Sequence, residues 1–328
     1  MKALVYTAER ELIYREEPDP VPAQGESVVR IQNVGICGSD MHAYLGHDER
    51  RVPPLILGHE AVGTIVEGSR SGRRVVLNPL ITCMCCNYCL SGRQNLCPDR
   101  DLIGMYRPGA FAEMIAIPER NLIDVPEGMD STKAALTEPG ATALHAVTLA
   151  ENAVSRPISE CSTLVIGAGS VGLLTALVLK DKGALAEISE TNPLRRRTVL
   201  EHTDCTVFDP QDSLPAADTY DLVFDAVGNS RTRDTAVASV RPGGVVVHIG
   251  LMDNQGGIDT RRLTLQEITF IGCYTYSPLD LRVTLEKLHS GALGTLDWYS
   301  SRPLEGGSEA FRQIHAGECG APKVILQL

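Results

Sequence analysis

The sequence predicts an α/β protein with two domains, one rich in β-strands and one built on a doubly wound parallel sheet. Up to about residue 137, short alternating segments are separated by glycine and proline. After about residue 140, near-continuous apolar segments alternate with helical ones. A chain of 328 residues, of which 43% are hydrophobic, is long enough for each domain to have its own apolar core.

The first part of the chain has the pattern of an antiparallel β-domain. Residues 27–31 and 74–77 are two of its short candidate strands. Glycine and proline punctuate the segments between such strands, so these segments are expected to be loops. The candidate reactive residues of this part fall on those loops.

The second part of the chain has the pattern of a parallel sheet covered by helices. The apolar residues 163–166 form a strand that meets a glycine turn and then a helix over 171–182. Further buried strands are expected at 184–188, 222–225 and 245–249. After them, the sequence predicts an amphipathic helix over residues 281–290 and an apolar terminal strand over residues 323–326.

Charge and composition exclude several classes of protein. A net charge of -11 opposes binding to a phosphate backbone, so no nucleic-acid partner is expected. No apolar stretch is long enough for a signal or membrane helix, so we expect a cytoplasmic protein without a membrane partner. In that reducing compartment, the ten cysteines point to metal ligands rather than disulfides.

Four cysteines at short spacing predict a structural zinc site. Cys83, Cys86 and Cys89 follow at three-residue intervals, and Cys97 returns after seven intervening residues. This spacing lets four thiolates turn onto one tetrahedral ion. A disulfide pair or four inert thiols is the alternative. Cys85 does not fit the spacing and is interpreted as a bystander or an occasional competitor for the metal.

A glycine motif between the predicted strand and helix predicts a dinucleotide site. Gly167 permits the tight turn, Gly169 lets the backbone approach a pyrophosphate, and Gly172 lets the helix pack on the strand. Ser170 and Val171 open the helix, whose first amides are free to bind an anion. The alternative is a glycine-rich turn that binds no ligand.

The ends of the later strands carry further candidates for cofactor contacts. Glu190 follows the next strand, where an acidic side chain would bond the ribose hydroxyls and repel a 2′-phosphate, so NAD is favoured over NADP. Arg195 and the two arginines after it could instead rescue some phosphate binding. Val227, Gly250 and Leu251 end two later strands and are candidate neighbours of the nicotinamide, although plain strand-end turns would have the same sequence.

A second group of metal-binding residue types lies on loops of the β-rich part. Cys37, His59 and nearby carboxylates supply a thiolate, an imidazole and oxygen ligands. Each residue alone is more often structural. Together, beside a cofactor domain, they suggest a second zinc ion with an open coordination position.

These motifs give the chain a clear resemblance to the zinc-dependent medium-chain dehydrogenases, the alcohol and polyol dehydrogenase superfamily that includes sorbitol and butanediol dehydrogenases. The resemblance is carried by Gly-Ile-Cys-Gly-Ser-Asp-Met-His at 35–42, Leu-Gly-His-Glu at 57–60, the cysteine cluster at 83–97, Glu138-Pro139 and the glycine motif at 167–172. It extends over almost the whole chain and implies two zinc ions and NAD as cofactors.

The resemblance also implies a domain organisation. A GroES-like catalytic domain would comprise residues 1–139 and 278–328, with the structural zinc lobe at 83–97. A Rossmann NAD-binding domain would comprise residues 140–277. Subunits of this superfamily often join cofactor domains edge to edge, so a homodimer or homotetramer is expected, with residues 265–274 as a possible edge strand.

By the same resemblance, Cys37, His59 and Glu138 would hold the catalytic zinc, with Glu60 as an alternate ligand. Asp40 would orient the His59 ring.

Two further expectations concern proton transfer and the cofactor. Ser39 would take the alcohol proton and pass it through the cofactor ribose to His42 and solvent. Lys323 would face Asp40 and the cofactor pyrophosphate.

The resemblance implies an NAD-dependent zinc dehydrogenase that interconverts a small secondary alcohol or polyol with its ketone. The substrate is therefore a small molecule. Sorbitol dehydrogenases carry an arginine about where Thr275 falls, so its absence weakens the sorbitol interpretation. Tyr44, Leu45, Tyr106 and Tyr276 are candidates for the substrate pocket.

Several alternatives remain open. The nearest is a zinc-free quinone or enone reductase of the same superfamily, which would lack the zinc motifs. A catalytically inactive protein that binds nucleotide and zinc, or a thiol redox sensor, is an alternative from another class. Within the enzyme class, the alternatives are a phosphorylated-polyol dehydrogenase and a primary-alcohol dehydrogenase.

Overall fold

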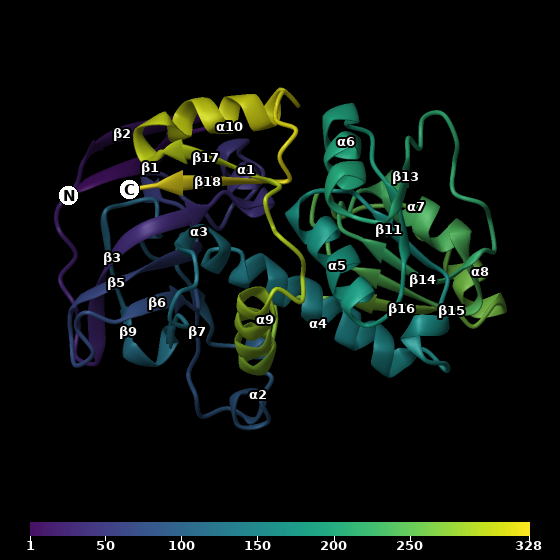
Figure 1. Cartoon of the computed structure of the whole chain (residues 1–328), viewed down its shortest axis with the longest axis horizontal. Coiled ribbons are helices and arrows are strands. Elements are labelled where there is room, and N and C mark those ends of the chain that lie inside the picture. Colours follow the sequence, from purple (N-terminus) through teal and green to yellow (C-terminus); the bar gives the residue numbers. More distant parts are fainter.

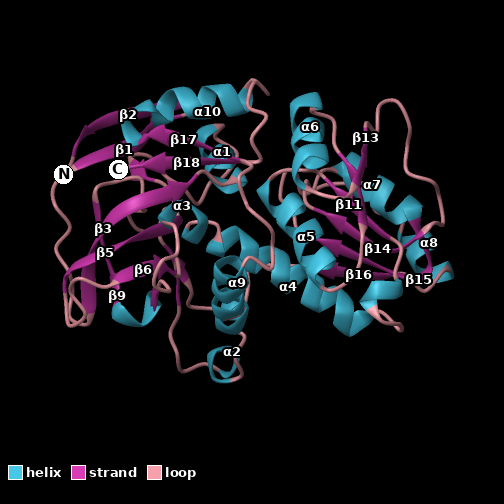
Figure 2. Ribbon diagram, viewed as in Figure 1, coloured by secondary structure: helices cyan, strands magenta, loops and turns pink.

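The computed structural model describes all residues from 1 to 328. The chain forms two bodies that lie side by side, joined by helices between them (Figure 1). Strands dominate the first body, which contains both chain ends, whereas helices flank the sheet of the second (Figure 2). No helix is both long and apolar enough to cross a membrane.

A seven-stranded sheet with β3 near its centre organises the first body. Its strands follow the order β10-β6-β5-β3-β18-β17, and β9 also pairs with β3. The sheet is antiparallel except for the β17–β18 pair. The strands are β3 (Glu26–Gly35), β5 (Glu60–Glu67), β6 (Arg74–Leu77), β9 (Met114–Pro118), β10 (Leu122–Asp124), β17 (Tyr299–Pro303) and β18 (Lys323–Gln327).

Smaller elements complete the first body. A three-stranded sheet has the order β2-β1-β4, and β7 pairs with β8. Their bounds are β1 (Lys2–Ala8), β2 (Glu11–Glu16), β4 (Leu55–Ile56), β7 (Leu80–Ile81) and β8 (Asp101–Leu102). The helices are α1 (Gly38–Tyr44), α2 (Asn87–Leu90), α3 (Ser131–Ala134) and α10 (Gly307–His315).

The second body has a six-stranded parallel sheet in the order β13-β12-β11-β14-β15-β16. Counted along the chain, this is the doubly wound order 3-2-1-4-5-6, in which the winding reverses between β11 and β14. The prediction of this fold class is confirmed. The strands are β11 (Thr163–Ile166), β12 (Ala186–Ser189), β13 (Thr206–Phe208), β14 (Tyr220–Asp225), β15 (Val240–His248) and β16 (Thr269–Gly272).

Helices cover this sheet, and their packing explains the apolar strands. Every residue of β11 and β14 is buried, as expected for parallel strands with helices on both faces. The helices are α5 (Ser170–Asp181), α6 (Pro193–His202), α7 (Ser230–Ser239) and α8 (Thr260–Leu265).

Two helices connect the bodies, α4 (Thr137–Ala153) and α9 (Pro278–Ser290). α4 packs against both α5 and α9, and both helices lie between the two sheets in Figure 1. α4 was not anticipated from the sequence, because buried small residues line most of it and leave no clear amphipathic period. Because α4 runs across residue 139, the domain boundaries at 139/140 and 277/278 stay predictions.

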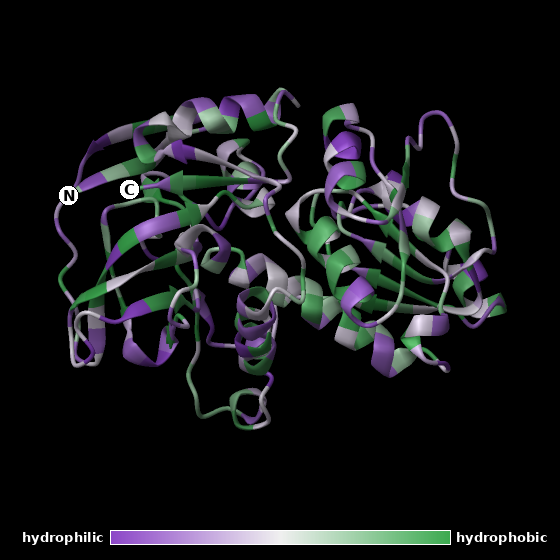
Figure 3. Cartoon of the chain, in the orientation of Figure 1, coloured by the Kyte–Doolittle hydropathy of each residue, from purple (hydrophilic) through white to green (hydrophobic).

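The apolar residues collect in two large clusters. One lies around α4, α5 and the parallel sheet, and the other fills the first body around β3 and β5. In Figure 3, green apolar segments concentrate in the strands and in the inner helices, while purple segments mark the outer helices and loops.

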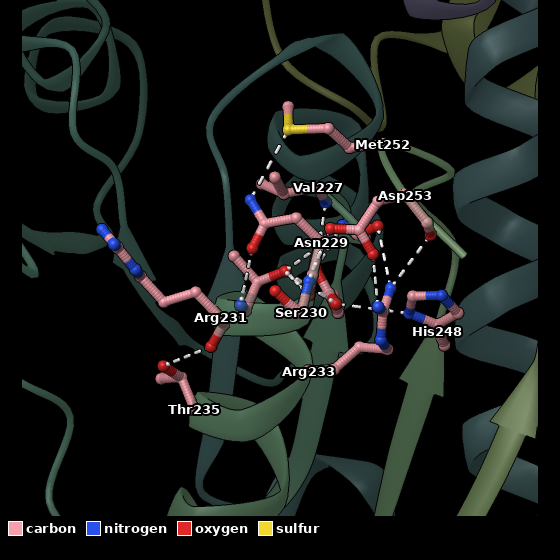
Figure 4. A network of polar contacts seen from close by, with 12 residues as sticks. Val227, Asn229, Ser230, Arg231, Arg233, Thr235, His248, Met252 and Asp253 are labelled. Carbon is pink, nitrogen blue, oxygen red and sulfur yellow. Dashed lines mark hydrogen bonds and ion pairs between the residues drawn. The ribbon is translucent and has the colours of Figure 1, made fainter. Parts of the chain in front are cut away.

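A buried arginine network ties the loops at the carboxyl ends of β14 and β15. Arg233 on α7 is 4% exposed and makes five hydrogen bonds (Figure 4). Its acceptors are the carbonyls of Gly228, Asp253, Gln255 and Gly256 and the Asp253 carboxylate. The network therefore fixes residues 253–256 against the start of α7.

We expect Arg233→Met to destabilise the protein by about 1–3 kcal/mol, because it removes the donor from the buried Gly228 carbonyl and from several part-buried acceptors. The matched control is Arg231→Met on the same helix, since Arg231 is exposed and points away from the network in Figure 4. Urea unfolding measures both free energies. Equal midpoints for Arg233→Met and the unmodified protein would show that the network adds no stability.

Candidate catalytic and metal sites

The four predicted cysteine ligands come together in one lobe. The sulfur atoms of Cys83, Cys86, Cys89 and Cys97 all lie within 4.8 Å of one another. The Cys97 and Cys83 sulfurs are 3.5 Å apart, and none of these cysteines forms a disulfide. Sulfurs at this spacing without an S–S bond suit a tetrahedral zinc ion. Cys85 is exposed and outside the group.

The electrostatics of the lobe favour a bound cation. Backbone amides of residues 85 and 86 lower the pKa of Cys83 to about 6, whereas burial raises the pKa of Cys97 to about 11. Four thiolates this close together repel one another unless a cation neutralises them. A zinc ion would supply that charge and would order a loop that contains only the single-turn helix α2.

A second group forms where β3 and β5 meet. Ligand atoms of Cys37, His59 and Glu60 lie within 4.8 Å of one another. Cys37 caps α1 directly after β3, and Glu60 begins β5. His59 is 4% exposed and Glu60 is fully buried. A thiol, an imidazole and a carboxylate in one buried group fit zinc.

Asp40 connects these ligands to the backbone. Its carboxylate accepts the Cys37 amide at 3.0 Å and the Gly58 amide at 3.3 Å, and it lies 3.5 Å from Nδ1 of His59. Burial would raise the pKa of Asp40, but His59 and Arg51 hold it low. Burial would likewise lower the pKa of His59, which Asp40 and Cys37 keep well above its usual value. Asp40 is therefore placed to orient the imidazole.

Lys323 has a different partner from the one predicted. Its buried ammonium donates to both Glu60 oxygens at 2.7 and 2.6 Å and to the Ile36 carbonyl at 2.9 Å. These three bonds occupy its three protons, and none of them goes to Asp40. β18 brings Lys323 beside Glu60 through long-range pairing with β3. The contact of Lys323 with a cofactor pyrophosphate stays a prediction.

Glu138 lies outside the Cys37 group. It is buried in the first turn of α4. Burial raises its pKa to about 7, and the Glu60 carboxylate adds to that rise. Tyr276 lies beside it, fully buried, and its hydroxyl has no hydrogen bond of good geometry. The assignment of Glu138 as a zinc ligand stays a prediction.

The predicted proton-relay residues are near the Cys37 group but do not contact each other directly. Ser39 Oγ accepts a hydrogen bond from the buried Arg51 at 3.2 Å. His42 is half-buried, and burial together with His47 lowers its pKa. Sequence reasoning missed Arg51, whose burial depends on Asp48 and on the carbonyl of Gly104.

The glycine turn has the geometry that a dinucleotide needs. Gly167 has φ of +94°, and a Cβ on Gly172 would lie 1.9 Å from the Gly167 carbonyl oxygen. A Cβ on Gly169 would instead meet nothing within 4 Å, so the space beside it is open. No side chain caps α5, which leaves the amides of its first turn, Ser170 and Val171, free.

The other candidate cofactor residues surround this turn. Glu190 accepts the Ala168 amide at 2.7 Å and so touches the turn itself. Nε of Arg195 is buried without a partner. A Cβ on Gly167 would meet Val227 at 2.6 Å, and one on Gly250 would lie 2.1 Å from the Val227 carbonyl carbon.

The structure thus brings Val227 and Gly250 to the glycine turn, at the point where the winding of the sheet reverses. Leu251 follows and is 61% exposed. These placements fit a nucleotide, although the individual contacts stay predictions. Tyr44, in contrast, packs in the core against Phe311 at 5.4 Å between ring centroids.

A doubly wound sheet with a free helix N-terminus, next to a buried thiol, imidazole and carboxylate group, defines a nucleotide-dependent metal oxidoreductase. Comparison with known proteins agrees. The profile described as the alcohol dehydrogenase GroES-like domain matches residues 23–127, and that of the zinc-binding dehydrogenases matches residues 170–290. The chain therefore belongs to the zinc-binding alcohol dehydrogenase family, as the sequence motifs predicted.

Relatives within this family cover most or all of the chain. The chain is 31% identical to the L-galactonate-5-dehydrogenase of Escherichia coli K12 over 85% of both chains. It is 30% identical to an L-threonine 3-dehydrogenase of Streptomyces coelicolor over 99% of both. Among solved structures, alcohol dehydrogenase TADH from Thermus sp. ATN1 superposes with a TM-score of 0.91, at 26% identity over 100% of both chains. The chain is accordingly a zinc-dependent oxidoreductase that acts on alcohols.

Replacing one ligand in each metal group is expected to have different effects. Cys37→Ala should remove one zinc ion and turnover while changing unfolding little. Cys89→Ala should remove the other ion and lower the free energy of unfolding by at least about 2 kcal/mol, because that ion orders its lobe. Zinc analysis, thermal unfolding and initial rates measure this separation, and Cys85→Ala serves as the control. Full zinc content in Cys37→Ala would contradict the site at Cys37.

Proposed function

We propose that this protein oxidises a small secondary alcohol or polyol to its ketone with NAD. The observation that carries the proposal is the group of Cys37, His59 and Glu60, in which His59 and Glu60 are buried and Glu138 lies nearby. These residues would hold a zinc ion, with Glu60 and Glu138 as alternate carboxylate ligands. When bound, zinc acts as a Lewis acid that lowers the pKa of a substrate hydroxyl. NAD, held at the glycine turn, supplies the hydride acceptor.

The chain's own residues prepare this site. Asp40 orients His59 through the 3.5 Å contact with Nδ1. The Lys323 ammonium donates to both oxygens of Glu60. It thereby balances the negative charge of Glu60, one of the two neighbouring carboxylates; the other is Glu138. The pKa of Glu138, raised by burial to about 7, leaves it able to exchange a proton near neutrality when no metal is bound.

Ser39 is placed to receive the proton of the reacting alcohol. Arg51 donates to its oxygen at 3.2 Å, which orients the hydroxyl and leaves its lone pairs partly free. His42, half-buried with a lowered pKa, is a base that is neutral at physiological pH. No hydrogen bond joins Ser39 to His42 directly, so a bound group would have to connect them, and the ribose hydroxyls of NAD would supply that connection.

We further propose a cytoplasmic homo-oligomer. All ten cysteines are free, as expected in a reducing compartment. β16 is an edge strand of the six-stranded sheet, so its outer backbone groups are available to a second subunit.

Glu190 should set the preference for NAD. Its buried carboxylate at the glycine turn would bond the ribose hydroxyls and repel a 2′-phosphate. We expect Glu190→Gln, which keeps an oxygen for the Ala168 amide, to raise the NADP-to-NAD ratio of kcat/KM by about tenfold. Glu201→Gln, an exposed change on α6, is the control. An unchanged ratio would remove Glu190 from the specificity determinants.

The reaction itself is tested by initial rates of NAD reduction with sugar alcohols, vicinal diols and simple secondary alcohols, before and after treatment with a zinc chelator. Turnover that chelation abolishes and added zinc restores is the expected result. Turnover of primary alcohols alone would contradict the proposed substrate class, and turnover that survives complete zinc removal would contradict the zinc mechanism.

A further inference from the structure

A small cleft of about 130 Å³ lies where the segment after β16 meets the first body. Arg50, Arg100 and Tyr106 come from the first body, and Tyr274 comes from the segment that follows β16. Asp101 is the one acidic residue in its lining. Clefts between domains with a few convergent polar groups are where small ligands bind.

Contacts of Arg51 link the neighbourhood of this cleft to Ser39. The Arg51 guanidinium donates to Ser39 Oγ at 3.2 Å and to the Gly104 carbonyl at 2.9 Å. Arg50, which precedes Arg51 in the chain, and Met105, which follows Gly104, line the cleft. The cleft lining and Ser39 are therefore connected through Arg51.

Arg100 offers unused donors to this cleft. Its guanidinium stacks over the Tyr274 ring, 4.9 Å from the centroid, and donates one bond, to the Cys97 carbonyl at 2.9 Å. It makes no ion pair, so its remaining N–H groups have no acceptor in the protein. Stacking fixes the plane of the guanidinium, which suits bidentate binding of a carboxylate or phosphate.

The local charge is opposite to that of the whole protein. The lining itself contains two arginines, Arg50 and Arg100, and one acidic residue, Asp101. Asp48, outside the lining, pairs with Arg50 and Arg51. The chain as a whole has a net charge of -11. A cationic excess in the cleft of such an acidic protein points to an anionic ligand.

We propose that the substrate is an anionic alcohol whose terminal carboxylate or phosphate lies against Arg100 and Arg50, while its reacting hydroxyl lies at the Cys37 group. This inference rests on the proposed function and names its substrate class. The tyrosine hydroxyls of Tyr106 and Tyr274 line the same cleft and can bond the chain hydroxyls of such a substrate.

The test uses three probes that share the configuration of a six-carbon chain and differ only at C1: glucitol, gluconate and glucitol 1-phosphate. We measure kcat/KM with NAD and, independently of turnover, the affinity of each probe by calorimetry with the NADH complex. At least one anion should exceed glucitol by about tenfold or more in both quantities. The ranking of gluconate and glucitol 1-phosphate then distinguishes a carboxylate from a phosphate.

Two variants assign the effect to Arg100. Arg100→Gln should lower the affinity for the preferred anion by about tenfold and change that for glucitol by less than about twofold. Arg93→Gln, in the same lobe but outside the cleft, should change neither. Added salt should weaken the binding of the anion only.

The outcomes separate this inference from the proposed function. Equal affinity for all three probes, or an equal loss with Arg100→Gln for neutral and anionic probes, overturns the anionic site. Zinc-dependent oxidation of neutral alcohols would in that case leave the proposed function intact. Tight, Arg100-dependent binding of an anion without oxidation of any alcohol would support the anion site and contradict the proposed function.

Discussion

The groups around Lys323 include more side chains that can carry a negative charge than side chains that can carry a positive one. The catalytic site of the first body depends on how these charges are balanced. Cys37, Glu60 and Glu138 can each carry a negative charge there, whereas Lys323 and a protonated His59 supply the cations. Buried charges must be paired or they destabilise the fold. Burial raises the pKa of Glu138 to about 7, and the neighbouring Glu60 carboxylate adds to that rise. A divalent cation would balance the Glu138 carboxylate and release the proton.

The backbone supports this charged group through one close approach. Gly35 on β3 pairs with Glu60 on β5, and a Cβ at Gly35 would lie 2.0 Å from a Glu60 carboxylate oxygen. The same Cβ would lie 3.2 Å from the Lys323 side chain. Glycine at position 35 therefore leaves the space in which the Glu60–Lys323 ion pair lies against β3. The sheet register and the electrostatics of the site depend on the same residue.

Local motifs could be predicted from the sequence, whereas long-range contacts could not. The cysteine spacing and the glycine turn each lie within a few residues, so the sequence contains their whole geometry. The partner of Lys323 and the contact of Arg51 with Ser39 depend on how separate strands and loops pack. α4 escaped prediction for a related reason, since most of its residues are small or apolar and are buried by packing against α5 and α9.

The cysteine lobe contacts Tyr274, which lines the substrate cleft, so the stability of the lobe affects the cleft. Asn95, two residues before Cys97, donates to the Tyr274 carbonyl at 3.0 Å, and Arg100, three residues after Cys97, stacks on the Tyr274 ring. Thr275, which follows, has φ of +46°, a left-handed conformation that is strained for a β-branched residue. Tyr274 on one side of it lines the cleft, while Tyr276 on the other is buried beside Glu138. An ion that orders the lobe therefore also orders the segment that leads from the cleft at Tyr274 to Tyr276 beside Glu138.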